Sequence, residues 1–373
     1  MMFADQHRDL ATLTAADRYR SLRPRAGVDF ASNDYLGLAG SDRLRGAMAE
    51  ALARGVPVGS GGSRLLRGNA PEHEALEAAA ARFFGTEAAL FFASGYVANT
   101  ILFATLPQRA DLIVHDALIH ASAHEGMRLT RATCVRAAHN DAGAVEDAIA
   151  TWRSAGGTGQ VWIAVESLYS MDGDRAPLGD LARVADRHDA ILLIDEAHAT
   201  GVFGTDGRGL AEGLDGRENV ITLRTCGKAL GCEGALLCGP AVMRDFIVNR
   251  GRGFIFSTAP SPLMALAVDE ALRIVADEPG RRERLWDLVA TAARVLAPHG
   301  VAATGSQILP LVLGDAARTM RVADAIQRAG FDVRGIRPPT VPEGGSRLRI
   351  SLTLNATVAD IEALGVIMGE ALQ

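Results

Sequence analysis

The stretch NVITLRTCGKALGCEGALLCG, from Asn219 to Gly239, contains two short apolar runs with one lysine between them. GALLCG is continuously apolar, and NVITLRT is mainly apolar, although Thr222 and Arg224 interrupt it. Continuous runs of this length are typical of strands that are buried on both faces of a sheet. Lys228 therefore follows a buried strand, and its neighbours are small or apolar.

Three interpretations of Lys228 compete. A phosphate-binding P-loop needs a glycine five residues before Gly227 and a hydroxyl residue after the lysine, but Thr222 and Ala229 stand there. A plain surface lysine is the commonest kind. A partly buried lysine has a lowered pKa, and its neutral amine forms a Schiff base with a carbonyl. The third interpretation requires a cofactor site elsewhere in the chain.

Further apolar runs precede this stretch and alternate with helical patterns such as EHEALEAAAARFF at 72–84. They are AALFFAS (88–94), DLIVHD (111–116), VWIAVES (161–167) and AILLIDEAH (190–198). This order predicts an α/β fold with a mainly parallel sheet, covered by helices on both faces, which binds ligands beyond the carboxyl ends of its strands.

The remaining chain has a different pattern. A long helical pattern runs from Pro262 to about Arg294, and ILPLVLGD (308–315), a helix near 319–329 and SRLRISLTLN (346–355) follow it. These segments predict a smaller α+β domain at the C-terminus. We expect an N-terminal arm over 1–45, a large domain over 46–275 and a small domain over 276–373. The glycine-rich GSGGSR at 59–64 lacks the last glycine of a dinucleotide fingerprint, so a turn is expected there.

Composition limits the functional classes. The 373 residues are 48% hydrophobic and carry a net charge of −6, which gives no general attraction to nucleic acid or to an anionic membrane. No apolar run reaches a membrane span, and the N-terminus lacks the apolar core of a signal peptide, so a cytoplasmic protein is expected. The four cysteines match no zinc spacing, so we expect buried thiols without a metal or a disulfide.

Asp195 ends one apolar run, and His198 follows in the string DEAH. A helicase also carries DEAH but needs the P-loop already excluded, and capping a turn is the commoner role of an aspartate at a strand end. Lys228 lies beyond the end of the next run, so both side chains can meet at one sheet edge. Pyridoxal 5'-phosphate (PLP) requires such a pair, because the lysine binds its aldehyde and the acid keeps its ring nitrogen protonated.

A phosphate site is also needed. In FFASGYVANTIL the chain passes from a strand through Ser94, Gly95 and Tyr96 into a helix, whose free N–H groups favour an anion. The Thr225 hydroxyl is a second candidate donor. His115, His120 and His124 offer a rival metal site, although they lack the HExxH order of a zinc protease. An imidazole stacked on a cofactor ring suits His120 better.

With these residues in place, the chain resembles the α-oxoamine synthases, which are fold-type I PLP enzymes, over nearly its whole length. The matching motifs include FASNDYLGL from Phe30, SMDGDRAPL from Ser170, DEAHATGVFGTDGRG from Asp195, TCGKALG from Thr225 and RPPTVPEGGSRLRISLT from Arg337. Each motif is moderately specific, and their shared order and spacing are highly specific.

The resemblance implies a role for each matching residue. For the cofactor these are Lys228 as the covalent and proton-moving amine, Asp195 at the ring nitrogen, His198 and Ser170 at the ring oxygen, His120 stacked on the ring, and Gly95, Tyr96 and Thr225 at the phosphate. Thr258 would reach the phosphate of a neighbouring subunit, which implies a homodimer with shared sites. Arg349 would bind the amino-acid carboxylate, and Asn33, Glu166 and Thr340 would lie on the substrate side.

The implied reaction is a decarboxylative condensation of L-alanine with pimeloyl-CoA or pimeloyl-acyl carrier protein in biotin biosynthesis. A sibling enzyme that uses glycine or serine with another acyl thioester is the alternative. A non-catalytic partner subunit would lack the lysine that this chain has. Two departures from the family pattern remain: Cys226 replaces a larger residue, and the short N-terminal segment leaves Arg18, Arg20 and Arg23 open as the acyl-substrate arginine, with Arg20 assigned.

Overall fold

A computed structural model describes residues 2–373 of the chain. The chain forms two compact units. The larger consists of Leu36–Tyr169 and Arg175–Arg282, and the smaller of Met1–Tyr35, Ser170–Asp174 and Glu283–Gln373.

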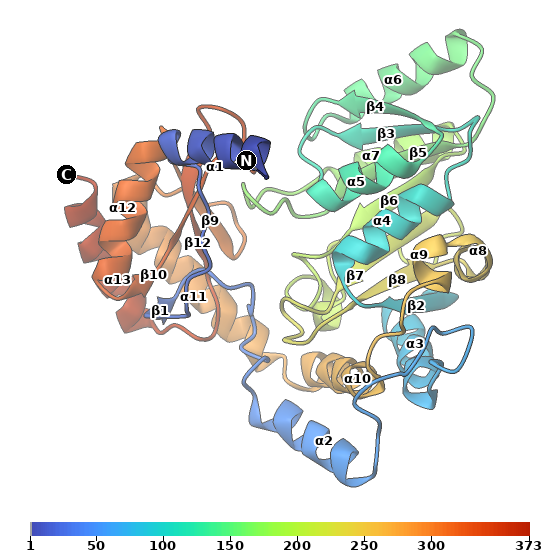
Figure 1. Cartoon of the computed structure of the whole chain (residues 1–373), viewed down its shortest axis with the longest axis horizontal. Helices are drawn as coiled ribbons and strands as arrows, with labels where there is room; N and C mark the ends of the chain where they lie inside the picture. Colours follow the sequence, from blue (N-terminus) through green and yellow to red (C-terminus); the bar gives the residue numbers. More distant parts are fainter. Residues whose placement is uncertain (1) are drawn as a thin grey trace. The chain divides into compact units, whose positions relative to one another are not determined.

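A seven-stranded sheet forms the centre of the larger unit (Figure 1). From edge to edge its strands are β2 (Ala88–Phe92), β8 (Ala235–Gly239), β7 (Val220–Thr225), β6 (Ile191–Asp195), β5 (Val161–Glu166), β3 (Leu112–Asp116) and β4 (Thr133–Ala137). β8 pairs antiparallel with both neighbours, and the other pairs are parallel. The predicted mainly parallel sheet is confirmed.

Helices cover both faces of this sheet. Apolar side chains on one face pack under α4 (Gly95–Thr105), α5 (Ala121–Leu129), α8 (Ala241–Arg250) and α9 (Arg252–Ile255). Those on the other face pack under α6 (Ala142–Ser154) and α7 (Leu178–Arg187). The unit also holds α2 (Asp42–Ala53), α3 (Pro71–Phe84), α10 (Pro262–Asp277) and the 3-10 turn η1 (Thr205–Gly207). Burial on both faces explains why most of these strands are continuously apolar.

Two differences from the expected elements have local causes. The apolar pattern did not predict β4, because this edge strand is mostly exposed and contains Thr133 and Arg136. The helical pattern after Pro262 is divided into α10 and α11 (Gly280–Leu296), and Pro279 stands between them. A proline disfavours the helical conformation of the residue before it, which here is Glu278.

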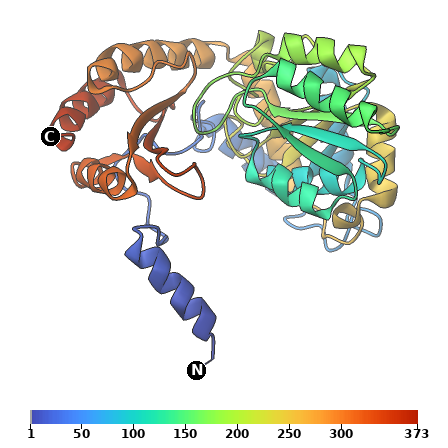
Figure 2. The same ribbon diagram turned by 90° about the horizontal axis from the view of Figure 1, so that it is seen from above.

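The smaller unit contains an antiparallel sheet in the order β11 (Arg334–Ile336), β12 (Ser346–Ser351) and β9 (Ile308–Gly314). A short parallel pair joins β1 (Val28–Asp29) to β10 (Phe331–Asp332). The other elements are α1 (Ala4–Ala15), α12 (Ala316–Arg328), α13 (Val358–Ala371), the 3-10 turn η2 (Ala297–His299) and most of α11. α1 has no buried residue and projects from the unit in Figure 2.

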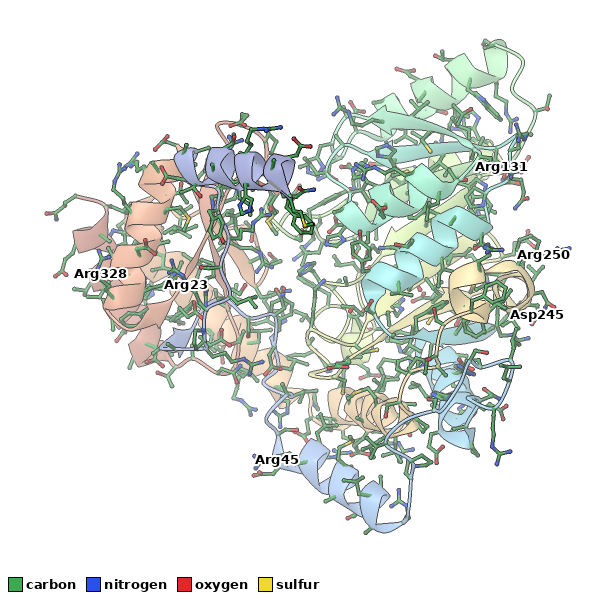
Figure 3. All side chains as sticks on the ribbon, in the orientation of Figure 1. Arg23, Arg45, Arg131, Asp245, Arg250 and Arg328 are labelled. Carbon is green, nitrogen blue, oxygen red and sulfur yellow. The ribbon has the colours of Figure 1, made fainter. Side chains whose placement is uncertain are left out.

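Charged side chains lie mainly on the outside, as Arg45, Arg131 and Arg250 show in Figure 3. Among residues 2–373 the buried arginines are Arg224, Arg347 and Arg349. The prediction of buried thiols is correct for Cys226 and Cys238 but wrong for Cys134, which is exposed because it lies on the edge strand β4. None of the helices described is long and apolar enough to span a membrane.

Candidate active site

The carboxyl ends of β6 and β7 lie side by side, because the two strands are parallel neighbours. β6 ends at Asp195 and β7 at Thr225. Glu166, at the end of β5, is in register with Asp195. A Cβ added to Gly95 would lie 3.5 Å from the Thr225 Oγ1 atom, so the start of α4 reaches the same edge. The structure thus brings Gly95, Glu166, Asp195 and Thr225 to the same edge of the sheet.

Lys228 is held in a tight loop between β7 and β8. The Lys228 carbonyl accepts a 2.9 Å hydrogen bond from the Gly231 N–H, and the Cys226 carbonyl accepts one of 2.9 Å from the Cys232 N–H. Gly231 has φ +63°, and a Cβ there would lie 2.3 Å from the Ala39 nitrogen, so the loop requires glycine. Lys228 is half-buried.

Lys228 is also the only lysine of the chain; the other 37 of the 38 cationic residues are arginines. Guanidinium groups remain protonated, whereas a lysine amine can be neutral and nucleophilic. Composition is thus a second sequence signal, beside position, that singles out Lys228.

The Asp195 carboxylate accepts hydrogen bonds at both oxygens. The Ala197 N–H donates to Oδ1 at 2.9 Å, and the Asn99 Nδ2 donates to Oδ2 at 2.8 Å. Asn99 lies on α4 and is buried. His198 follows in the turn after β6 and is buried as well. The carboxylate therefore has a defined orientation at the end of its strand.

His120 precedes α5 and caps its first turn, because its Nδ1 accepts a hydrogen bond from the Ser122 N–H. Partial burial of the ring lowers the pKa of His120; the Asp195 carboxylate opposes this shift, and the Lys228 cation adds to it. His120 is joined to Asp195 through Asn99 and Ser122, and Lys228 follows β7, the strand that pairs with β6.

The start of α4 has the features of an anion site. The Ser94 side chain caps the helix by accepting from the Val97 N–H at 3.2 Å, and Gly95 and Tyr96 are the first helical residues. Backbone N–H groups at a helix start, together with the helix dipole, favour a phosphate. The Thr225 hydroxyl lies beside Gly95. Thr258 is exposed in the segment between α9 and α10.

In the smaller unit, the buried Arg349 on β12 points toward neutral acceptors. Its guanidinium donates to the Ser170 carbonyl at 2.6 Å, the Ser351 Oγ at 2.6 Å and the Asn33 Oδ1 at 3.1 Å. Tyr35 Oη lies 3.4 Å away. No ion pair joins Arg349 to a carboxylate within residues 2–373, whereas Arg347 pairs with Asp172. Arg349 therefore holds a buried charge that an anionic ligand can neutralise.

Three arginines near the N-terminus differ in their partners. Arg18 pairs with Glu343, and Arg23 pairs with Asp324. Arg20 instead donates to the Thr340 Oγ1 at 3.1 Å and has no carboxylate partner in the part of the chain described. Arg337 donates a 2.7 Å hydrogen bond to the carbonyl of Tyr19, the residue before Arg20. Burial, followed by the Arg20 and Arg23 cations, lowers the pKa of Arg337. The structure therefore joins Arg20 to Thr340 and adds Arg337, which the sequence argument did not assign.

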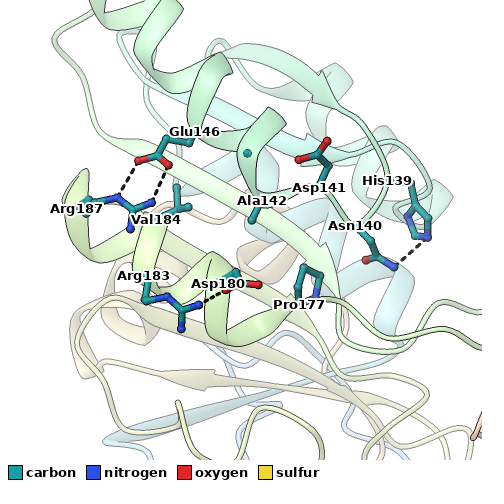
Figure 4. Close-up of a pocket in the computed structure, with 11 residues that line it drawn as sticks. His139, Asn140, Asp141, Ala142, Glu146, Pro177, Asp180, Arg183, Val184 and Arg187 are labelled. Atoms are coloured by element: carbon teal, nitrogen blue, oxygen red, sulfur yellow. Dashed lines mark hydrogen bonds and ion pairs between the residues drawn. The ribbon is translucent and has the colours of Figure 1, made fainter.

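A polar cavity of about 630 Å³ lies elsewhere, between α6 and α7 (Figure 4). Four of its charged groups form two ion pairs, Arg187 with Glu146 and Arg183 with Asp180, and Asp141 accepts a hydrogen bond from the Ala144 N–H. The histidines of the rival metal site also contact one another, because the rings of His115 and His124 pack edge to face. Within residues 2–373 no group of three acidic, histidine or cysteine side chains is arranged to hold a metal.

This sheet, with a lysine, an aspartate and two imidazoles around its strand ends, defines a fold-type I PLP enzyme. The family model for aminotransferase class I and II matches residues 25–364. The chain is 43% identical over 370 residues to 8-amino-7-oxononanoate synthase from Anaeromyxobacter dehalogenans (strain 2CP-1), which covers 95% of this chain and 92% of that protein. The chain therefore belongs to the 8-amino-7-oxononanoate synthase family.

Solved structures agree with this placement. Serine palmitoyltransferase from S. paucimobilis, with a bound PLP–myriocin aldimine, superposes with a TM-score of 0.88 at 26% identity, over 99% of this chain and 97% of that one. The 8-amino-7-oxononanoate synthase from Francisella tularensis superposes with a TM-score of 0.78 at 26% identity, over 92% and 97% of the two chains.

Proposed function

We propose that this protein condenses L-alanine with a pimeloyl thioester of coenzyme A or acyl carrier protein. The products are 8-amino-7-oxononanoate, carbon dioxide and the free thiol, a step of biotin biosynthesis. The observation that carries the proposal is the group of Lys228, Asp195 and His120 at one sheet edge, in a chain 43% identical to an 8-amino-7-oxononanoate synthase. A cytoplasmic location belongs to the same proposal.

The residues at the sheet edge fit PLP. The chain's only lysine is half-buried there, Asp195 accepts at both oxygens, and a helix start with a nearby hydroxyl suits a phosphate. Lys228 would hold the cofactor covalently, and Asp195, His198, His120 and Ser170 would hold its ring. Gly95, Tyr96 and Thr225 would hold its phosphate. When bound, PLP supplies an electron sink for the carbanion formed at the α-carbon of alanine.

Lys228 has the properties of the group that moves the α-proton. Its amine is half-buried at the sheet edge, where a neutral lysine amine can accept a proton from the α-carbon. The loop that ends at Gly231 limits where this amine can lie. Lys228 therefore both holds the cofactor and takes the proton from the α-carbon.

Arg349 binds the carboxylate of alanine in this proposal. Its planar guanidinium is oriented by Ser170, Ser351 and Asn33 and forms no ion pair with a carboxylate of residues 2–373. A bidentate contact with the alanine carboxylate fixes the direction of the Cα–H bond, which speeds removal of the proton. Asn33 and Glu166 are assigned to the same substrate side.

Arg20 is assigned to the acyl substrate. The pairing of Arg18 and Arg23 with carboxylates leaves Arg20 as the arginine of this group that can receive a new anion. Its contact with Thr340 and its proximity to Arg337 support the same assignment. The terminal carboxylate of a pimeloyl chain has the charge that such a group binds.

A homodimer with shared sites completes the proposal. Leu66 and Phe256 are 85% and 72% exposed. A 2.9 Å hydrogen bond from the Ala259 N–H to the Gly62 carbonyl joins their two segments in the larger unit. Large apolar side chains that are exposed on two connected segments are typical of a protein interface. Thr258 lies in the same segment as Phe256. In a dimer formed through this surface, Thr258 would contact the cofactor phosphate of the partner subunit.

Thiol release from a panel of acyl thioesters, each combined with alanine, glycine and serine, tests the proposal. We expect release with alanine and pimeloyl thioester, and none in the Lys228→Ala variant. Faster release with glycine or serine and a different acyl chain would assign the sibling reaction instead. Release that is equal in the Lys228→Ala variant would overturn the proposed chemistry.

A further inference from the structure

A chain of hydrogen bonds connects Asp195 to His120 through two buried side chains. Asn99 Nδ2 lies 2.8 Å from Asp195 Oδ2 and 3.0 Å from the Ser122 Oγ. The Ser122 Oγ in turn lies 2.8 Å from His120 Nδ1. Asn99 and Ser122 are 5% and 1% exposed. The four residues come from α4, α5, the segment before α5 and β6.

The direction of each proton in this chain follows from the chemistry of its ends. The amide nitrogen of Asn99 has to face Asp195, because the amide oxygen would meet a carboxylate that cannot donate. That nitrogen also donates to the Ser122 Oγ, so the single hydroxyl proton of Ser122 is available for His120. The Ser122 backbone N–H, 3.2 Å from the same Nδ1, can only donate.

His120 Nδ1 therefore accepts from two donors and carries no proton. The imidazole is neutral, and its proton lies on Nε2. The lowered pKa of His120 agrees with this state. The charged and titratable groups that influence the ring are Asp195 after β6, Lys228 after β7 and His124 on α5.

The packing of α4 against α5 holds these hydrogen-bonded side chains in place. A Cβ on Gly126 of α5 would lie 2.8 Å from Phe103 Cβ and 2.9 Å from the Asn99 carbonyl oxygen, both on α4. A larger residue at 126 would separate the helices, and with them Asn99 from Ser122. The glycine thus permits the close approach on which the hydrogen bonds depend.

We propose that Asn99 and Ser122 are positioning residues: together they hold Asp195 in one orientation and His120 in its neutral Nε2–H tautomer. The kinetic consequences of this proposal rest on the proposed function, in which His120 and Asp195 act on the same cofactor ring. The orientation of Asp195 and the tautomer of His120 are properties of the folded protein and do not depend on that function.

Nitrogen-15 NMR of the nine histidines tests the structural statement before cofactor is added. The signals of His120 are assigned by their loss in His120→Gln. At pH 7 we expect a pyridine-type Nδ1 and a pyrrole-type Nε2. Ser122→Ala removes one donor to Nδ1, so the pKa of His120 is expected to rise by about half to one unit. Ser154→Ala, on the exposed end of α6, is the matched control and leaves His120 unchanged.

A proton on Nδ1 of the wild-type protein at pH 7, or a doubly protonated ring, would overturn the proposal. An unchanged pKa in a folded Ser122→Ala variant would remove Ser122 from it. Ser122→Thr retains the hydroxyl and is expected to keep the tautomer of the wild type. These measurements require no substrate, so they stand even if the thiol-release assay rejects the proposed function.

The kinetic arm uses the holoenzyme and Asn99→Leu, which is similar in volume but removes both amide donors. We expect kcat to fall roughly tenfold, as for a lost hydrogen bond to a charged group, with an unchanged KM for the thioester. An unchanged kcat in the folded variant would show that Asn99 does not position Asp195.

Discussion

At the scale of single residues, Lys228 is distinguished both by its position and by its residue type. It lies in a glycine-dependent loop after β7 and is the only lysine in 373 residues. A reagent that fixes a carbonyl to an ε-amine can therefore label one side chain. This property makes the central assignment directly measurable.

We expect borohydride reduction of the holoenzyme to attach one cofactor per chain, at the peptide that contains Lys228. Lys228→Ala is expected to lose this attachment and turnover, while it still binds PLP through the phosphate and ring contacts. Peptide mass analysis and a cofactor-binding titration measure the two effects. Covalent labelling elsewhere in the wild type, or full turnover in Lys228→Ala, would reject the role of Lys228.

Arg349 is the residue that separates amino-acid recognition from cofactor chemistry. Lysine at this position supplies a charge but no planar fork. Loss of a charge-assisted hydrogen bond costs about 1.5 to 3 kcal/mol, so Arg349→Lys is expected to weaken alanine binding roughly tenfold to a hundredfold. Titration of alanine against the cofactor absorbance gives the dissociation constant.

The matched control for Arg349→Lys is Arg347→Lys, two residues away on β12. Arg347 already pairs with Asp172, so its replacement is expected to leave alanine binding nearly unchanged. The reverse order of effects would assign the carboxylate to Arg347. Cofactor binding should be retained in both variants, because neither arginine is assigned to it.

At the scale of secondary-structure elements, successive side chains of β7 point to opposite faces of the sheet. The candidate site lies on one face, and a buried ionic cluster lies on the other. Leu223 and Thr225 face α4, whereas Arg224 is fully buried on the opposite face of β7. Its guanidinium lies 2.8 and 2.7 Å from the two oxygens of Asp215, 3.5 Å from Glu196 Oε2 and 4.0 Å from the centre of the Phe84 ring. The cluster joins β7 to the turn that follows β6.

Arg224→Leu is expected to lower the free energy of unfolding by about 3 to 5 kcal/mol, because it leaves buried carboxylates unpaired. Urea denaturation at pH 8 measures this loss. Arg273→Leu breaks the pair of the exposed Arg273 with the partly buried Asp269 and is expected to change stability by less than about 1 kcal/mol. Equal losses in the two variants would show that the buried cluster is not structurally important.

The pH dependence of the Arg224→Leu loss has a defined sign. Burial raises the pKa of both Glu196 and Asp215, with Arg224 opposing the shift. The folded state therefore binds more protons than the unfolded state above the ordinary carboxyl range, and these groups contribute less stability as pH rises. Removal of Arg224 raises both pKa values further. We expect the loss to be smaller at pH 5 than at pH 8.

At the scale of the whole molecule, the dimer is the remaining part of the proposal. A charge at Leu66 is expected to prevent association without unfolding the chain, because this side chain is 85% exposed. Sedimentation is expected to show a dimer for the wild type and a smaller species for Leu66→Asp, together with weaker PLP binding. Val366→Asp, at an exposed position of α13 in the smaller unit, is the control and should remain dimeric.

Much of the fold and part of the site could be predicted from the sequence because the relevant signals are local. Continuous apolar runs mark strands buried on both faces, and strands of one direction bring Asp195 and Thr225 to a common edge. Two features of the sheet could not be predicted in this way. β4 is an exposed edge strand and lacks an apolar run. The antiparallel direction of β8 has no signal either, because an apolar run has the same composition in both directions.

What the sequence by itself determined is the set of chemical groups and the elements that carry them: a single lysine after a buried strand, an aspartate at a strand end and a helix start with a capping serine. Only the tertiary structure decided how these groups are paired. It shows Asn99 between Asp195 and Ser122, Arg20 in contact with Thr340, and Arg224 buried with two carboxylates. The physical reason is that strand and cap signals depend on neighbours along the chain, whereas pairing depends on residues that folding brings together from distant segments.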